Sequence, residues 1–420
     1  MNQSEIILEN GMRLTVINSH ELPLVRLYGI IKAGNYFHYN PYIPVLTSDL
    51  LTRGTAQQSR KAFAAYCDKF GLEFDMADCG PLNVFFNGSS PSRFIDFLLA
   101  VCRDALFSPL FSAEELAIAK KENLAGVMRG ADSPELLAKW EVMSMLYTKN
   151  HPLYAFPAEQ YLERYIDFVN NATRNEIVAF WKTWYAPSRI HLVLAGDVDA
   201  PSIQTAQALF EREVGAFSFF ANQTYLHDVL PLQADERIVY LPQKSSAVYW
   251  AGQAISITSA HADFPALKMA IAILGAGMQS RLFNQVREKK GYSYSIGATI
   301  NYSEEFPGYW RIIAHCNPSN IWKVRDEVAD VLRIFVEKGV TEEEIREAQM
   351  FLKGRRFFAA SSLQGIAAQT IPDIIAKHPG LTQSIEDRIM VLTVDEVNDV
   401  MRRHVIPDAM KVALAGTIDK

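Results

Sequence analysis

Residues 192–199, LVLAGDVD, recur further along the chain as residues 412–419, VALAGTID, at a constant shift of 220. The match continues upstream at the same shift, so that residues 173–199 align with residues 393–419. Each copy predicts an amphipathic helix with a capping box, then a proline-marked turn and a buried strand that ends at glycine. The paired positions that define this pattern are Thr173 with Thr393, Glu176 with Glu396, and Pro187 with Pro407.

A second pair of segments repeats earlier in each copy. FSAEELAIAKKENLAG begins at residue 111 and VTEEEIREAQMFLKG at residue 340, a shift of 229 that small insertions explain. A period this long is not that of a solenoid, whose repeats span roughly 20 to 50 residues. We therefore expect two homologous halves, residues 1–215 and 230–420, joined by a linker at residues 216–229 that has no clean hydrophobic period.

Both halves mix predicted strands with long predicted helices, which indicates an α+β fold. The clustered order of these elements favours mainly antiparallel sheets covered on one face by helices over alternating βαβ units. The predicted strands are MRLTVI, VRLYGIIKAG, RIVYLP and SAVYWAGQAI, and the longest predicted helices are SRFIDFLLAVCRDALF and NIWKVRDEVADVLRIFVEKG.

Composition and charge exclude several function classes. The chain has 420 residues, 49% hydrophobic and 21% charged, with a formal charge of −6, so it offers no basic field for nucleic acid or an anionic membrane. No apolar run approaches the ~20 residues of a membrane span, and the N-terminus lacks a signal-peptide pattern. We expect a cytoplasmic protein that binds neither nucleic acid nor membrane, with a periplasmic location open if the chain is a mature form.

The cysteines and histidines do not form a recognisable metal or disulfide pattern. No two of the nine histidines are three or four residues apart, so no helical zinc pair exists. A site assembled from distant histidines stays possible. The four cysteines include no CxxC, and we expect reduced, partly buried thiols at Cys67, Cys79, Cys102 and Cys316.

Two further segments contain turn or helix signals that bear on function. IPVLTSDLLTRGT, residues 43–55, predicts a short buried helix with proline at its start and a glycine stop. ILGAGMQSR contains Gly275 and Gly277, but it follows a helical segment and lacks GK[ST], so neither nucleotide-binding fingerprint fits. We expect these glycines to form a tight turn between two helices, with a substrate contact through the loop as a secondary possibility.

The chain resembles the inverted zinc metallopeptidases, the family of pitrilysin, insulin-degrading enzyme and the mitochondrial processing peptidase. The resemblance covers nearly the whole chain and is carried by KAGNYFHYNPYIPVLTSDLLTRGT, by the AGDV strand end and by SRLFNQVREKKGYSYSIGA. It implies a half clamshell made of two peptidase-like domains. In that family H-x-x-E-H lies on a helix that is followed by Gly-Thr, and a glutamate further along is the third zinc ligand.

This sequence departs from the family motif at every position that zinc chemistry needs. Counting back from Gly-Thr, the resemblance places the two histidines at Val45 and Asp49 and the glutamate at Ser48. The third ligand falls on Arg129, seven residues after Glu122. A valine and an arginine cannot replace an imidazole and a carboxylate, so we expect no metal or other cofactor in this chain. Asp49 is either a retained functional acid or, as we favour, a structural carboxylate.

The second half keeps a pair that the family uses. A helix is expected from about residue 278 to 289, ended by Gly291, with a strand from about Tyr292. Arg287 and Tyr294 match the Arg and Tyr that in the family reach over the zinc site. A tyrosine hydroxyl can stabilise the developing oxyanion, and an arginine can bind peptide carbonyls. The alternative is a surface charge and an ordinary strand aromatic.

These features lead to one functional hypothesis and one rival. We expect the non-catalytic, substrate-binding subunit of a heterodimeric zinc peptidase, with zinc and H-x-x-E-H in a homologous partner chain and a peptide as substrate. No zinc peptidase activity is expected from this chain alone, only a contribution to that of the pair. The rival is a catalytically inert structural or assembly protein of the same fold, as found among the core subunits of a respiratory complex.

Overall fold

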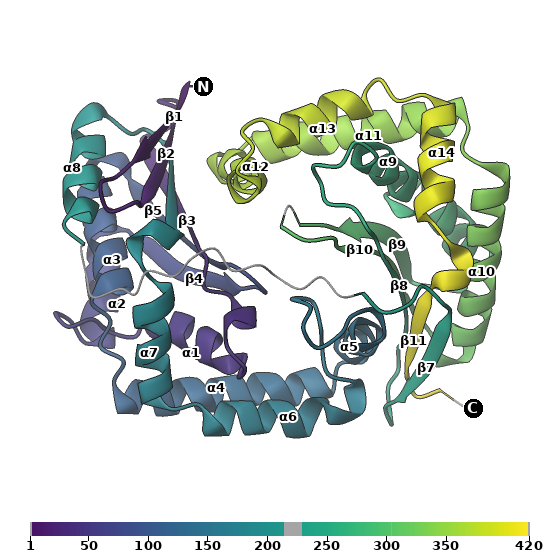
Figure 1. Ribbon diagram of the computed structural model, residues 1–420, viewed down its shortest axis with the longest axis horizontal. Coiled ribbons are helices and arrows are strands. Elements are labelled where there is room, and N and C mark those ends of the chain that lie inside the picture. The colour runs from purple at the N-terminus through teal and green to yellow at the C-terminus, as the bar shows by residue number, and fades with distance from the viewer. Residues whose placement is uncertain (1, 214–228, 304, 419–420) are drawn as a thin grey trace. The chain divides into compact units, whose positions relative to one another are not determined.

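The computed structural model describes residues 2–213, 229–303 and 305–418, which pack as two compact units, each built around its own sheet (Figure 1). The expected linker at 216–229 lies outside the described residues except for Val229, which pairs with Tyr147 in a short antiparallel bridge. The first unit comprises Met1–Val127, Glu163–Thr224 and Ser361–Ala368, and the second comprises Met128–Leu162, Tyr225–Ala360 and Gln369–Lys420.

The first unit contains a six-stranded sheet in its described part, in the order β1-β2-β6-β3-β5-β4. All neighbouring strands are antiparallel except β2 and β6. Its strands are β1 Asn2–Ile7, β2 Arg13–Asn18, β3 Leu24–Ile31, β4 Glu73–Cys79, β5 Val84–Pro91 and β6 Ile190–Gly196. Its helices are α1 Tyr42–Leu50, α2 Arg60–Phe70, α3 Ile95–Phe107, α7 Arg174–Trp184 and α8 Ala200–Glu211, with most of α4 Ala113–Ala131 and α6 Ala158–Asn171.

The second unit repeats this plan with a five-stranded sheet in its described part, in the order β7-β11-β8-β10-β9. Here β7 and β11 are the parallel pair. Its strands are β7 Asp235–Tyr240, β8 Ala247–Ala254, β9 Ser295–Asn301, β10 Tyr309–Cys316 and β11 Lys411–Gly416. Its helices are α5 Pro134–Leu146, α9 Phe264–Gly275, α10 Ile321–Lys338, α11 Glu342–Ala360, α13 Leu381–Ile389 and α14 Val394–His404, with part of α12 Leu363–Ala376.

The internal repeat predicted from the sequence is confirmed. The helices α7 and α14 both begin with a complete capping box, in which the threonine oxygen accepts from the glutamate N–H and the glutamate side chain accepts in return. Each helix leads through a 3-10 turn at proline into a buried strand, β6 or β11, that ends at glycine. The fold is therefore α+β, with two homologous and mainly antiparallel sheets.

The expectation that helices cover only one face of each sheet is wrong for the second unit. The strand β8 is buried along its whole length, because helices α9 and α10 lie on one face and α5 lies on the other (Figure 1). Tyr249 packs in the core with α9, whereas a side chain at Gly252 would contact Val142 of α5. Since α5 comes from the first half of the sequence, the expected division into two halves does not predict that it lies on this sheet.

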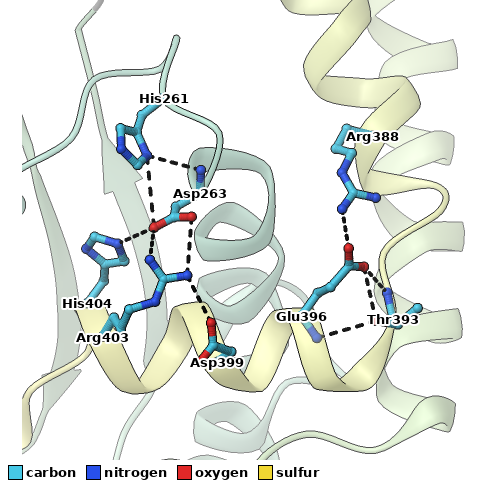
Figure 2. Close-up of polar contacts among 8 residues, drawn as sticks. All are labelled: His261, Asp263, Arg388, Thr393, Glu396, Asp399, Arg403 and His404. Atoms are coloured by element: carbon cyan, nitrogen blue, oxygen red, sulfur yellow. Dashed lines mark hydrogen bonds and ion pairs between the residues drawn. The ribbon is translucent and has the colours of Figure 1, made fainter.

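A polar cluster joins α9 and α14 within the second unit (Figure 2). The carboxylate of Asp263, at the N-terminal cap position of α9, accepts from Arg403 and lies 3.0 Å from His404 Nε2. Burial raises the pKa of Asp263, but the hydrogen bonds from His404 and Arg403 outweigh it and hold that pKa below its usual value. Asp399 also binds Arg403 at 3.0 Å. The charged groups of this cluster therefore bind one another, and their contacts link the two helices.

Candidate functional site

The degenerate zinc motif lies on α1 in the first unit. This helix begins at Tyr42, so the proline at position 44 lies within its first turn and not at its first position. The helix ends at Leu50 with Leu51 as its C-terminal cap, so the glycine stop expected at Gly54 is wrong. Gly54, with a φ of 117°, instead pairs with Ser59 in a short bridge beyond the helix. Val45 is half-buried and Ser48 is buried, so neither presents a metal-binding group to solvent.

Asp49 is held by a neighbouring helix. Its Oδ2 accepts a hydrogen bond of 2.7 Å from Asn123 Nδ2 of α4. Burial raises the pKa of the Asp49 carboxyl, while this amide and the Arg53 guanidinium act to lower it. Asp49 is therefore a partnered, half-buried carboxylate.

An ion-pair network surrounds this contact. Arg53 binds Glu122 of α4 and lies 3.7 Å from Glu115, which is also 3.3 Å from Arg60 of α2. The hydrogen bond from Arg53 is the main cause that lowers the pKa of Glu122. Carboxylates in this arrangement are neutralised by guanidinium groups, so they do not form the vacant, anionic ligand set that zinc prefers.

Arg129, the position that the resemblance assigns to the third ligand, is exposed near the end of α4 in the second unit. The α4 residue bonded to Asp49 is Asn123, which no sequence motif singles out. Tyr185 was also missed. Its hydroxyl is buried without a hydrogen-bond partner among the described residues, and this burial is the main cause that raises its pKa, with smaller contributions from Cys79 and Asp49. Across the described ranges, no three His, Cys, Asp or Glu side chains gather in a way that could hold a metal ion.

Arg287 lies on an unusual helix in the second unit. The segment forms α-helical turns from residue 281 and then a π-helix, η4, at Phe283–Lys289, so the helix expected from residue 278 starts later. Lys290 N donates to Gln285 O at 3.2 Å, a bond that spans five residues and widens the turn. The Arg287 guanidinium lies 4.8 Å from the Phe283 ring centre, and 44% of its side chain is exposed. Short π-helices are often found at functional sites.

Tyr294 follows the same segment. Gly291 adopts a φ of 64° and closes the helix, as predicted. Tyr292 N donates back to Val286 O at 3.0 Å, so the strand β9 begins at Ser295 and not at Tyr292. Tyr294 N binds His315 O at 2.7 Å, which fixes the backbone while 60% of the tyrosine remains exposed. Arg287 and Tyr294 thus lie on one continuous segment of the second unit.

The two loop glycines have different roles. Gly277 adopts a φ of 81° and forms the predicted turn. Gly275 is instead the last residue of α9, and a Cβ there would lie 2.1 Å from Ala298 N of β9. Only glycine lets α9 approach the sheet so closely. The tight-turn prediction is therefore right for Gly277 and wrong for Gly275.

The thiols behave as expected. All four cysteines are free, and burial raises the pKa of the Cys67 thiol to about 11 and that of Cys316 to about 12. They are therefore protonated and unreactive at neutral pH. In the described part of the chain, no helix combines the length and apolar character needed to cross a bilayer.

The two-sheet α+β fold is that of M16-like peptidase halves. Residues 171–352 match the family described as Peptidase M16 inactive domain. The structure of a peptidase M16 inactive domain from Pseudomonas fluorescens has a TM-score of 0.89 and 22% identity, and the alignment covers 100% of this chain and 99% of that one.

Two relatives are similar to this chain in sequence. An uncharacterized zinc protease of Streptomyces coelicolor is 28% identical over 249 residues, 56% of this chain, and the match spans only 52% of that protein. The non-peptidase homolog YmxG of Helicobacter pylori is 20% identical over 408 residues, with 94% of this chain and 90% of that protein covered. The chain is thus similar to the M16 peptidases in sequence over residues 171–352 and in fold over its whole length.

Proposed function

We propose that this chain is the non-catalytic, substrate-binding subunit of a two-chain zinc metallopeptidase. A homologous subunit with an intact H-x-x-E-H motif would hold the zinc and supply the attacking water. The observation that carries the proposal is that Arg287 on the π-helix and Tyr294 just after it are both exposed. The positions that the resemblance assigns to the zinc motif are Val45, Ser48 and Asp49, which cannot form that site. The relatives include both a zinc protease and a non-peptidase homolog, so the proposal has an active and an inactive type of protein to draw on.

Each residue has a distinct chemical role in this proposal. Hydrolysis of a peptide bond builds negative charge on the scissile carbonyl oxygen, and the Tyr294 hydroxyl donates a hydrogen bond to it. The Arg287 guanidinium offers several donors in a fixed plane and binds backbone carbonyls of the peptide before and during reaction. Tyr294 therefore acts mainly on turnover, and Arg287 acts on both binding and turnover.

The test is kinetic and uses the pair of subunits. The chain is co-expressed with the H-x-x-E-H homologue from the same genome, and cleavage of a fluorogenic peptide is measured for each chain alone and for the pair. We expect activity only in the pair. Tyr294→Phe should lower kcat by about 100 to 1,000-fold, the usual effect of losing one oxyanion donor, and Arg287→Ala should also raise KM.

A matched control is Tyr240→Phe, which removes the hydroxyl of another exposed tyrosine in the same unit. It should leave kcat unchanged, and gel filtration should show that every variant assembles. If the Tyr294 and Arg287 variants assemble and cleave peptide like the unaltered pair, the chain is instead a structural or assembly protein. The cytoplasmic location is also a proposal, which fractionation of the source cell with compartment markers would test.

A further inference from the structure

The C-terminal half of α11 exposes large apolar side chains on one face. Met350 is 68% exposed, Phe357 68% and Phe358 82%. Together with Gly354 they recur at helical spacing, so the four residues share one side of the helix, which we call the α11 stripe. A Cβ added at Gly354 would meet nothing within 4 Å, so the middle of the stripe faces open space. Exposed apolar patches of this kind usually mark binding surfaces.

Positive charge flanks the α11 stripe. Lys353 and Arg355 are exposed on its two sides, and the Arg355 guanidinium lies 5.9 Å from the Phe351 ring centre. The sequence contains no Asp or Glu from residue 348 to residue 372, although the chain as a whole carries a charge of −6. The stripe therefore combines apolar side chains with a local cationic field, which favours an apolar ligand that carries carboxylates.

The helix is fastened to the loop that leads into the π-helix. Arg281 donates to Glu344 of α11 at 2.6 and 2.8 Å and to Gly339 O at 2.6 Å. The Phe351 ring lies against Gly277, where a Cβ would be only 2.9 Å away. The segment that carries Arg287 follows directly. The α11 stripe and Arg287 therefore lie in the same unit, on elements that Arg281 and Phe351 join.

We propose that the α11 stripe is a second peptide-binding surface, which recognises an apolar segment of the substrate flanked by acidic residues. Apolar side chains of the peptide pack on Met350 and Phe357 and approach the helix closely at Gly354, while its carboxylates pair with Lys353 and Arg355. The inference takes its ligand class from the proposed function. It adds the preference for acidic peptides, which the Arg and Tyr pair does not provide.

Binding to the isolated full chain tests this inference without a partner subunit. Three fluorescein-labelled peptides of equal length serve as probes: one with apolar anchors and flanking glutamates, one with lysines in place of the glutamates, and one with serines in place of the anchors. Fluorescence anisotropy should show at least about ten-fold tighter binding of the first peptide than of either other. Met350→Ser with Phe357→Ser should remove this binding, and the matched control Tyr240→Ser should not.

Charge reversal gives a second, gain-of-function criterion. Lys353→Glu with Arg355→Glu should invert the preference, so that the lysine peptide binds more tightly than the glutamate peptide. Equal binding of all three peptides, or no change in the Met350 and Phe357 variant, would overturn the inference. A third outcome would also overturn it. In that outcome the chain shows no preference among the peptides but sediments with anionic phosphatidylglycerol vesicles, and this sedimentation depends on Phe357.

The outcomes separate this inference from the proposed function. If peptide binding depends on the α11 stripe but Tyr294→Phe leaves turnover of the pair unchanged, the peptide-binding surface stands and the subunit role fails. If Tyr294→Phe lowers turnover but the stripe variants bind all peptides like the unaltered chain, the subunit role stands and this inference fails. Circular dichroism and gel filtration check that each variant is folded. We expect every variant to fold, because the substituted side chains are exposed.

Discussion

Asp49 and Asn123 are joined by a 2.7 Å hydrogen bond between a carboxylate and a side-chain amide. Asp49 is the position to which the resemblance assigns a zinc-binding histidine, and Asn123 approaches it from α4. A bond between two protein side chains here links α1 to α4, with the ion pairs of Arg53 beside it. We infer that direct hydrogen bonds stabilise this part of the fold, where a catalytic relative would use a metal ion.

Asn123→Ala should destabilise the protein by about 1–3 kcal/mol, because it leaves the half-buried Asp49 carboxylate without its amide donor. Urea unfolding followed by tryptophan fluorescence measures the change. Lys121→Ala is the matched control, since it alters an exposed residue of the same helix and should change stability by less than about 0.5 kcal/mol. Equal effects of the two substitutions would contradict a stabilising role for the Asp49 contact.

Asp49→Asn should change the dependence of stability on pH. The folded-state pKa of Asp49 is raised, chiefly by burial, so the folded chain holds this proton to higher pH than the unfolded chain does. The corresponding stability is fully present below the ordinary pKa of 3.8 and is lost as pH rises through the raised value. Asparagine keeps an acceptor for Asn123 without ionising. The unaltered protein should therefore lose stability relative to Asp49→Asn as pH rises from 3.8, measured by urea unfolding across this range. A constant difference between the two proteins would refute this assignment.

Zinc binding should appear when a full ligand set is introduced at the degenerate positions. The variant Val45→His, Ser48→Glu, Asp49→His and Asn123→Glu places two imidazoles one helical turn apart and a carboxylate on the facing helix. We expect about one zinc per chain after dialysis and a higher Tm with added zinc. The unaltered chain, measured in parallel by elemental analysis, should retain none. Placing the new glutamate at Arg129 instead is the control, and it should not give tight binding if Asn123 marks the facing position.

Glu327 should position the segment that carries Arg287. Its side chain is 17% exposed and accepts from Gln285 Nε2 at 2.8 Å, with Lys290 Nζ 3.8 Å away, so it contacts both sides of the π-helical turn. Glu327→Ala should therefore raise the KM of the reconstituted pair, by up to about 100-fold if the guanidinium shifts by about 1 Å. Glu327→Gln retains an acceptor for Gln285 and should restore most of the affinity. Similar KM values for the alanine variant and the unaltered pair would exclude this role.

The sequence alone was sufficient for the fold class and for the internal repeat. Thr173 and Thr393, with their glutamates three positions later, specify helix starts through contacts within four residues, and such local chemistry is visible in a linear pattern. The helix stop at Gly291 was predictable for the same reason, because a left-handed turn strongly favours glycine. The family motif also located Val45, Ser48, Asp49, Arg287 and Tyr294 as positions of interest.

Only the tertiary structure decided which residues meet across the chain. Asn123 bonds to Asp49 from a separate helix, and no local pattern distinguishes it from the neighbouring Glu122 or from Arg129. Helix α5 covers the second sheet although it is encoded in the first half, because burial of β8 on both faces requires a partner from elsewhere in the sequence. Helical periodicity specifies which face of an element is apolar, but the packing of distant segments determines what covers that face. For the same reason the exposed face of α11 is recognisable only in the structure, where Phe357 is 68% exposed among the described residues.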